Sequence, residues 1–347
     1  MSVFVEKVDS CVPALIQAPV RLMLWTRPDF LKKQYAVIRQ VRPKTLILVS
    51  DNGRSDEEVS AIAESRELFK DIDWECTVHR IFWNENQGMY SAWRQATDYI
   101  WGRFDRCIFL EDDDIPSKSF FFFCDEMLEK YKNDLRIQSI CGMNSIGIYD
   151  DVSSDYFFSK AGSIWGIAFW KRTYDQFLDY AYGNDAYIMR CINDNLSKAD
   201  KQFMSVVREC GEYHTVHGHI PGDEYYLRLA TYLHHQLKII PKKNLITNIG
   251  CDERGTHTNS LNFMTKKIQK LYYIPAYDYE LPFDHPKYVI EDKQYEAYID
   301  DIFDRGKPLR QKMRIVEIAY RKARYGGVKM LAKSIKKNLL KGKTIER

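Results

Sequence analysis

Four consecutive acids at residues 111–114, Glu-Asp-Asp-Asp, directly follow the apolar run Cys107 to Leu110. Adjacent carboxylates in a half-buried position repel one another unless a cation lies among them. A divalent metal is the simplest such cation, and Mg²⁺ or Mn²⁺ binds one or two carboxylates together with phosphate oxygens. The acidic run therefore predicts a metal site that meets a nucleoside diphosphate. A solvated acidic turn is the alternative interpretation.

Two classes of enzyme that bind a metal ion together with phosphate groups have acidic residues directly after an apolar strand. A P-loop NTPase also needs the string Gly-x-x-x-x-Gly-Lys-Ser/Thr, which this sequence lacks. In a sugar-nucleotide glycosyltransferase, the metal neutralises the leaving nucleoside diphosphate as the glycosidic bond breaks. The sequence favours this second chemistry.

The predicted strands and helices determine which residues lie near the acidic run at 111–114. The first 140 residues alternate apolar, β-rich runs with helical periodicity, which is typical of βα units in a mainly parallel sheet. Strands are predicted at 20–26, 45–50, 75–82, 106–110 and 137–141, and helices at 28–41, 55–69, 88–101 and 117–131. Ligands of such α/β sheets bind beyond the carboxyl ends of the strands, where the acidic run lies.

The second half of the chain is less regular. Helices are predicted at 171–182, 185–208 and 223–235, a strand at 237–240, and loops over 262–304. The expected organisation is a nucleotide-sugar-binding half at 1–145, an acceptor-binding half at 146–304 and a basic amphipathic tail at 305–347.

Six short motifs follow one another along residues 18–290: TRPD at 26–29, VSDNG at 49–53, NENQG at 84–88, EDDD at 111–114, SIWGIAFW at 163–170 and NIGCDERGTHT at 248–258. Their order and spacing resemble the metal-dependent GT-A glycosyltransferases, in particular bacterial proteins related to N-acetylglucosaminyltransferase I and family 2-like sugar transferases. The resemblance implies a Rossmann-like GT-A fold and a nucleoside diphosphate sugar donor, expected to be a UDP-sugar. It also implies a glycan or lipid-linked acceptor, inversion of configuration and a place in surface polysaccharide synthesis.

The resemblance implies contacts to the nucleotide sugar. Thr26 and Arg27 match positions that contact the nucleotide, and Asp51 matches an acceptor of hydrogen bonds from the base. A plain Asx-turn is the alternative interpretation of Asp51. Asn86 and Gly88 match a loop that approaches the sugar nucleotide closely, because Gly88 has no side chain.

The metal ligands are also implied by the resemblance. Asp113 matches the last carboxylate of the family's Glu-Asp-Asp, which binds Mn²⁺ or Mg²⁺, and Asp112 matches a ribose or indirect contact. Asp114 stands where relatives often have a small residue, so an offset of one position stays open. His257 matches a histidine that reaches the metal or the diphosphate, and a structural histidine is the alternative.

Direct displacement at the anomeric carbon needs a base that takes the proton of the acceptor hydroxyl. Asp223, or its neighbour Glu224, matches the family's carboxylate base, although Gly222 stands where relatives usually have Trp. The alternative is that both acids only favour a helix N-terminus. Trp165 matches an aromatic platform between the donor and acceptor sites, whereas Trp170 is expected to pack in the core.

Composition narrows the class of protein. Hydrophobic residues make up 45% of the 347 residues and charged residues 29%, values close to soluble globular averages. The chain has no uncharged apolar run of 18 residues and no signal-peptide pattern at its start, so we expect a cytoplasmic protein. The eight cysteines form no Cys-x-x-Cys pair and are expected to be reduced thiols.

Charge is distributed unevenly. Residues 305–347 hold 15 Lys or Arg and two acids, whereas residues 1–304 carry a net charge of −10. Basic and apolar residues alternate at helical spacing over 309–340, with a break at Gly326-Gly327. This favours two basic amphipathic helices on an anionic membrane surface, at the inner face of the cell membrane, over a solvated and packed terminal helix. Nucleic acid is not an expected partner, because no nucleic-acid-binding motif occurs.

Two other functions remain open at this point. A nucleotidyltransferase has a similar fold but usually begins with a Gly-rich basic loop, whereas this chain has Leu24-Trp25-Thr26-Arg27-Pro28 there. A non-catalytic glycan- or membrane-binding relative is the other alternative, and the candidate metal ligands argue against it.

Overall fold

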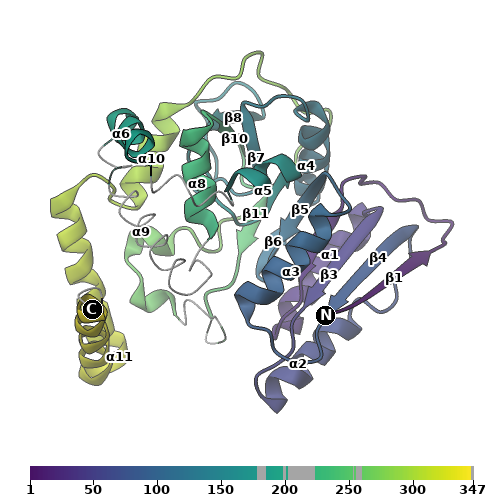
Figure 1. Ribbon diagram of the computed structural model, residues 1–347, viewed down its shortest axis with the longest axis horizontal. Coiled ribbons are helices and arrows are strands. Elements are labelled where there is room, and N and C mark those ends of the chain that lie inside the picture. Colours follow the sequence, from purple (N-terminus) through teal and green to yellow (C-terminus); the bar gives the residue numbers. More distant parts are fainter. Residues whose placement is uncertain (178–184, 198–200, 202–222, 253, 255–259, 345–347) are drawn as a thin grey trace.

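A computed structural model describes the chain except for residues 178–184, 198–200, 202–222, 253, 255–259 and 345–347, and except for the side chains of residues 177, 223–226 and 328–344. Within this part, one nine-stranded sheet runs through the molecule in the order β1-β4-β3-β2-β5-β9-β7-β10-β8 (Figure 1). Its strands are β1 Ser2–Val8, β2 Val20–Met23, β3 Thr45–Ser50, β4 Cys76–Phe82, β5 Arg106–Leu110, β7 Ile137–Cys141, β8 Tyr156–Ser159, β9 Ile167–Trp170 and β10 Leu237–Pro241.

The sheet is mainly parallel. Strands β4, β3, β2 and β5 pair parallel to one another, as do β7 and β10, whereas β9 is antiparallel to both β5 and β7. Antiparallel β1 and β8 form the two edges. The predicted α/β class is therefore confirmed, and both expected halves of the chain contribute strands to this sheet.

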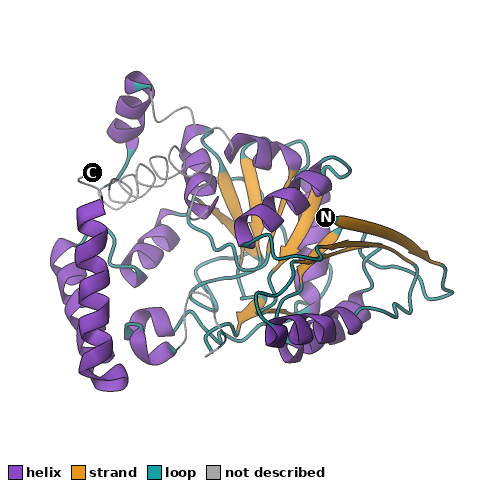
Figure 2. Ribbon diagram, turned by 60° about the horizontal axis from the view of Figure 1, so that its bottom comes forward, coloured by secondary structure: helices purple, strands orange, loops and turns teal. Residues whose placement is uncertain are grey.

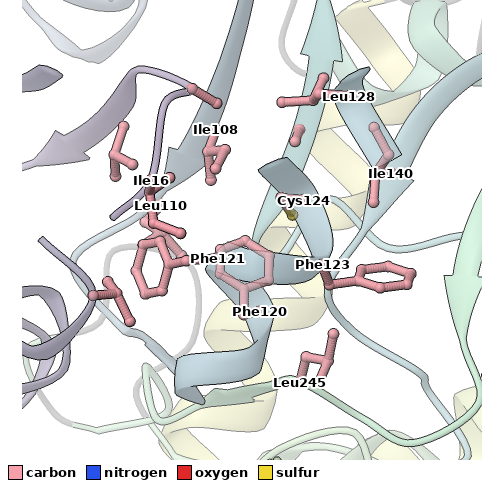
Figure 3. Packing of buried hydrophobic residues seen from close by; sticks show 14 of the residues in the cluster. Ile16, Ile108, Leu110, Phe120, Phe121, Phe123, Cys124, Leu128, Ile140 and Leu245 are labelled. Carbon is pink, nitrogen blue, oxygen red and sulfur yellow. The ribbon is translucent and has the colours of Figure 1, made fainter. Parts of the chain in front are cut away.

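Helices cover both faces of the sheet (Figure 2). They are α1 Pro28–Val41, α2 Asp56–Glu67, α3 Met89–Trp101, α4 Lys118–Lys130, α5 Lys171–Phe177, α6 Ala186–Asn195, α8 Asp223–Leu233, α9 Lys266–Gln269, α10 Lys293–Ile302 and α11 Pro308–Thr344. Buried residues of α1 and α4 share one hydrophobic cluster with the sheet, and those of α3, α5, α6 and α8 share another. Figure 3 shows Phe120, Phe121 and Phe123 of α4 inside the first cluster.

Local sequence signals explain several of these elements. Ser55 caps α2, because its side chain accepts a hydrogen bond from the amide of Glu58. Gly327 interrupts α11 with φ 74° and ψ 168°, so the predicted break at Gly326-Gly327 is confirmed to one residue.

Other predictions were wrong in part. The helix predicted at 185–208 ends at Asn195, because Leu196 is extended. Residues 262–304 contain α9 and α10 instead of loop alone. Helix α10 is capped by Asp292 and buries Tyr295 and Ile299, and two apolar positions among acids give little periodic signal.

Two further observations bear on the predicted class. The cysteines that the structure describes are free thiols. A search of the described helices for one long and apolar enough to cross a membrane found no candidate.

Candidate functional site

The order of the strands creates a crevice at the carboxyl ends of β2 and β5. The chain places β3 and β4 on one side of β2, and β5 on the other side. Loops leave β2 and β5 in opposite directions at such a switch point, which opens the position where α/β sheets bind ligands. The segments that follow these two strands are Leu24 to Arg27 and Glu111 to Asp114, so two of the predicted motifs meet at this crevice.

An arginine-carboxylate pair joins the two segments. Arg27 donates from Nε to Oδ2 of Asp112 at 2.8 Å and from Nη2 to Oδ1 of Asp112 at 2.5 Å. Its Nη2 also donates to Oδ2 of Asp113 at 3.2 Å. Both Arg27 and Asp112 are buried, and Nη1 of Arg27 is buried without a hydrogen-bond partner. The bidentate pair fixes the position of the acidic run relative to the start of α1.

Burial shifts the pKa values of these carboxyl groups upward. Burial raises the pKa of Asp112 to about 6, against the opposing effect of the Arg27 hydrogen bonds. The pKa of Asp113 is also raised, by burial first and by the negative charge of Glu111, while Arg27 opposes the shift. The site thus disfavours additional negative charge and favours a cation.

Asp114 has a structural position. It is fully buried, and its Oδ2 accepts hydrogen bonds from the amides of Glu111 at 3.3 Å and Gly166 at 3.0 Å. Its Oδ1 accepts from Nδ2 of Asn248 at 3.1 Å. Burial holds the pKa of Asp114 well above its usual range. Asp114 therefore connects three segments of the chain behind the site.

A C-terminal segment covers the acidic run from the other side. Strand β6, Asp114–Pro116, pairs antiparallel with β11, Ile246–Asn248, and this places Asn248 opposite Asp114. Asn248 donates from Nδ2 to Oδ1 of Asp113 at 3.0 Å, and the amide of Ile249 donates to the carbonyl of Asp113 at 3.0 Å. A Cβ on Gly250 would lie 1.9 Å from Oδ2 of Asp113, so any larger residue there would displace the Asp113 side chain. The motif at 248–258 thus begins in direct contact with Asp113.

The repulsion among the four acids is answered partly within the protein. Arg21 pairs with Glu111 at 2.8 Å, and Arg27 pairs with Asp112. These arginines supply the positive charge for which a metal ion was predicted, so the repulsion among the acids does not by itself require a metal ion. Of the three aspartates, Asp113 is the most accessible, because 20% of its side chain is exposed.

The residues present fit a metal ion that would be coordinated mainly by the phosphate oxygens of a bound substrate and by water. Among the described residues, no group of three or more His, Cys, Asp and Glu side chains could hold a metal ion. Mg²⁺ sites often consist of one or two carboxylates together with phosphate oxygens and water, and Asp113 can supply one carboxylate. The predicted ligand His257 lies outside the described residues.

A second group of predicted residues lies at the carboxyl ends of β3 and β4. Asp51 is buried, and its carboxylate accepts hydrogen bonds from the amides of Asn52 at 2.8 Å and Gln87 at 3.0 Å. Nδ2 of Asn86 donates to Oδ2 of Asp51 at 3.3 Å. Gly88 begins α3 with φ 79°, a conformation that favours glycine. Asp51 therefore orders the loop at 84–88 beside β2.

The remaining predicted residues have varied positions. Thr26 is half-buried in the turn that follows β2. Trp165 is half-buried, with its ring 5.1 Å from that of Tyr272. Trp170 is buried and donates to the carbonyl of Leu128 at 3.2 Å, which confirms its predicted place in the core. Asp223 is the first residue of α8, and the side chains of Asp223 and Glu224 lie outside the described part of the chain.

Two arginines with no predicted role support the site. Arg66 donates to the carbonyls of Ser50 at 3.1 Å and Trp83 at 3.3 Å, which ties the ends of β3 and β4 together. Arg254 forms ion pairs with Asp29 at 2.7 Å and with Asp252. Arg254 lies inside the motif at 248–258, which was a signal for its involvement, whereas Arg66 lies in the last turn of α2 with no motif around it.

Comparisons with known proteins add little to this geometry. No family model matches the chain, and no curated protein matches it. A solved structure described as UDP-glucose pyrophosphorylase complexed with UDP-glucose is similar over 66% of this chain and 92% of that chain, at 9% identity and a TM-score of 0.32. A likeness this weak carries no argument about function.

Proposed function

We propose that this chain is a metal-dependent glycosyltransferase that moves a sugar from a nucleoside diphosphate donor, expected to be a UDP-sugar, to an acceptor hydroxyl. The observation that supports it is the position of Asp113. This carboxylate lies at the switch point of an α/β sheet, stays partly exposed, and is oriented by Asn248 and Arg27. The motif resemblance adds the type of chemistry.

Each residue of the site has a role in this proposal. Asp113 would hold Mn²⁺ or Mg²⁺, with His257 as a second candidate ligand. When bound, the metal neutralises the negative charge that the leaving diphosphate gains. Arg27 orients Asp112 and Asp113 and keeps positive charge beside the diphosphate, and Asp51 orders the loop at 84–88 beside the nucleotide.

The reaction is a direct displacement in this proposal. Asp223, or Glu224, takes the proton of the acceptor hydroxyl while its oxygen forms a bond to the anomeric carbon. The bond between that carbon and the diphosphate oxygen breaks in the same step, and the nucleoside diphosphate leaves. The configuration at the anomeric carbon inverts.

The first experiment is calorimetric titration of UDP, GDP and dTDP into the purified chain, with and without Mn²⁺. Tight binding of one nucleotide that needs the metal supports the proposal and identifies the donor class. Sugars of that nucleotide are then screened for hydrolysis and transfer. Absence of binding by all three nucleotides in the presence of Mn²⁺ would refute a donor site at Asp113, and release of diphosphate from a nucleoside triphosphate would favour nucleotidyl transfer.

The proposal includes an anionic membrane surface as a partner, with the enzyme on the inner face of the cell membrane. Leu309, Met313, Val316 and Tyr320 of α11 are all exposed, and their spacing of four, three and four residues places them on one side of the helix. The charged side chains Arg310, Arg314 and Glu317 contact the body of the protein instead. An exposed apolar stripe on a basic helix suits the interface of an anionic bilayer.

A further inference from the structure

The two edges of the nine-stranded sheet differ in how they are covered. The edge strand β8 is fully buried, and the segment before α10 lies along it. The amide of Asp292 donates to the carbonyl of Phe158 at 2.7 Å, and Glu291 forms a parallel β-bridge with Phe158. At the other edge, β1 is the outermost strand (Figure 1) and pairs only with β4 among the described residues. Within this part of the chain, the outward-facing amides and carbonyls of β1 therefore have no partner strand.

Apolar side chains are exposed on both faces of β1. Phe4 is 62% exposed, Val5 48% and Val3 38%. By the register with β4, Val3 and Val5 share a face with Ile81, whereas Phe4 lies on the opposite face. The side chain of Ile81 is buried, so the layers that cover β4 do not extend over β1. The sheet therefore ends in a strand that is apolar and accessible on both faces.

Strand β1 lacks the features that usually keep an edge strand from pairing with another chain. It is seven residues long, contains no proline and pairs with β4 in a continuous register without a bulge. Its one acid, Glu6, forms an ion pair with Arg80 of β4, and its one lysine, Lys7, lies next to the last residue of the strand. Another extended segment can therefore add to this edge through main-chain hydrogen bonds.

A second copy of β1 suits this edge in one antiparallel register. Opposite residues share a face of a sheet, so a twofold-symmetric pair is centred on a residue that lies opposite itself. Centring on Phe4 places the two Phe4 side chains opposite each other on one face, and Val3 opposite Val5 on the other. Aromatic and β-branched pairs of this kind stabilise a sheet. Lys7 then lies opposite Met1, at the end of the paired segment.

The neighbouring registers are less favourable. Centring on Val5 places Phe4 opposite Glu6. It also places Val3 opposite Lys7, so that apolar side chains lie against charged ones. Centring on Glu6 or Lys7 places like charges directly opposite each other, which is destabilising. The pattern of apolar and charged residues therefore favours the register centred on Phe4.

We propose that the chain forms a twofold-symmetric homodimer in which β1 of one copy pairs antiparallel with β1 of the other, centred on Phe4. The two sheets then form one continuous sheet. Because β8 is covered, both edges of the described sheet are then paired or covered, and the assembly stops at two copies. One strand from each copy makes a small interface, so we expect a dissociation constant in the micromolar range. This inference rests on the fold and not on the proposed glycosyl transfer.

Sedimentation equilibrium of the full chain, without an N-terminal tag and over about 1 to 200 µM, measures the association. We expect a reversible equilibrium between monomer and dimer. Phe4→Lys should raise the dissociation constant by about tenfold or more, because it places two like charges at the centre of the strand pair. Leu135→Lys changes a residue of similar exposure, 68%, in the loop before β7 and should dimerise like the wild type. Circular dichroism confirms that both variants are folded.

Cysteine cross-linking tests the register. Cys11 is exposed and is replaced by Ser in every variant. Opposite residues have Cα atoms about 5 Å apart, within disulfide range, whereas residues two positions out of register are about 8 Å apart, which is too far. Phe4→Cys should therefore form a dimer that is linked through residue 4 of both copies, as identified by peptide mass spectrometry. Val3→Cys and Val5→Cys should link to each other when mixed, and neither should link to itself.

Three results would overturn the inference. A wild-type chain that stays monomeric up to about 200 µM does not form the proposed dimer. A dimer that Phe4→Lys does not weaken uses another surface, such as the exposed side of α11. A Val5→Cys chain that links to itself excludes the register centred on Phe4. Metal-dependent nucleotide binding is measured separately, so its failure would refute the glycosyltransferase proposal and leave the dimer unaffected.

Discussion

Three adjacent aspartates experience three different environments at the end of β5. Both carboxylate oxygens of Asp112 accept hydrogen bonds from Arg27, through its Nε and Nη2, and Asp114 is fully buried among backbone amides and Asn248. Asp113 lies between them with one-fifth of its side chain exposed. Neighbouring residues of one type therefore differ in burial and in hydrogen-bond partners, and of the three Asp113 is the most accessible to a ligand.

Asp113→Ala should reduce metal-dependent nucleotide affinity and transfer by about a hundredfold or more, because the proposed metal loses its carboxylate. The free energy of unfolding should fall by only about 1 kcal/mol, since two hydrogen bonds at a partly exposed group are lost. Calorimetry with Mn²⁺ and urea unfolding measure the two effects.

Asp114→Ala is the matched contrast. It leaves the amides of Glu111 and Gly166 without an acceptor, so the free energy of unfolding should fall by about 3 kcal/mol or more. If Asp113→Ala bound the nucleotide with wild-type affinity, Asp113 would not be a metal ligand.

At the scale of elements, the site is assembled where β11 docks on β6. This short pair brings Asn248 and Gly250 against Asp113. Gly166, in the turn before β9, donates its amide to the neighbouring Asp114. The position of the ligand carboxylate therefore depends on a segment that is not part of the main sheet.

Gly250→Ala should weaken metal-dependent nucleotide binding by about tenfold or more, although Gly250 binds nothing itself. The new methyl group would lie 1.9 Å from Oδ2 of Asp113, so the carboxylate must move. Gly102→Ala is the control, because its methyl group would meet the carbonyl of Asp98 at an ordinary 3.4 Å. Unchanged affinity in Gly250→Ala would mean that the position of Asp113 is not critical.

Helix α10 contributes a pH dependence to the stability of the fold. Burial, and repulsion from Glu291, raise the pKa of Glu296 from 4.5 to about 7 against the hydrogen bond from Lys160. The folded state thus disfavours the ionised group, so its cost is absent below pH 4.5, grows as the pH rises toward 7 and is constant above that.

Glu296→Gln should therefore gain stability relative to the wild type as the pH rises from 4.5 to 7. Urea unfolding at the two pH values measures the difference, with the exposed Glu280→Gln as the control. An equal difference between variant and wild type at both pH values would contradict the shifted pKa.

At the scale of the whole molecule, charged side chains of α11 contact the body of the protein, whereas apolar side chains of the same helix are exposed. The first part of α11 attaches to the body through Arg310, Arg314 and Glu317 and turns Leu309 and Val316 outward. An amphipathic helix normally buries its apolar side against its own protein, whereas this orientation leaves the apolar side of α11 exposed, as the proposed membrane contact would require.

Vesicles of phosphatidylcholine with added phosphatidylglycerol should bind the chain, and salt should weaken the binding. Substitution of Leu309, Met313 and Val316 together by Ser should weaken it by about tenfold or more, because three apolar side chains lose their burial in the bilayer. Leu135→Ser with Ile290→Ser removes equally exposed apolar residues elsewhere and should bind like the wild type. Equal binding by both variants would exclude the stripe as the contact.

The sequence alone determined the parallel strands β2, β3, β4, β5, β7 and β10, the helices that follow the first four of them, and the position of four acids after a strand. These are local properties, because periodicity and capping depend on residues a few positions apart. The antiparallel strands β1, β8 and β9 and helix α10 were missed, since a short or exposed element leaves a weak pattern.

Only the tertiary structure decided how the four acids differ. Arg27 reaches Asp112 across 85 positions of the sequence, and Asn248 reaches Asp113 across 135. Burial and pairing of charges depend on such distant contacts, and these in turn set which carboxylate stays open to a ligand.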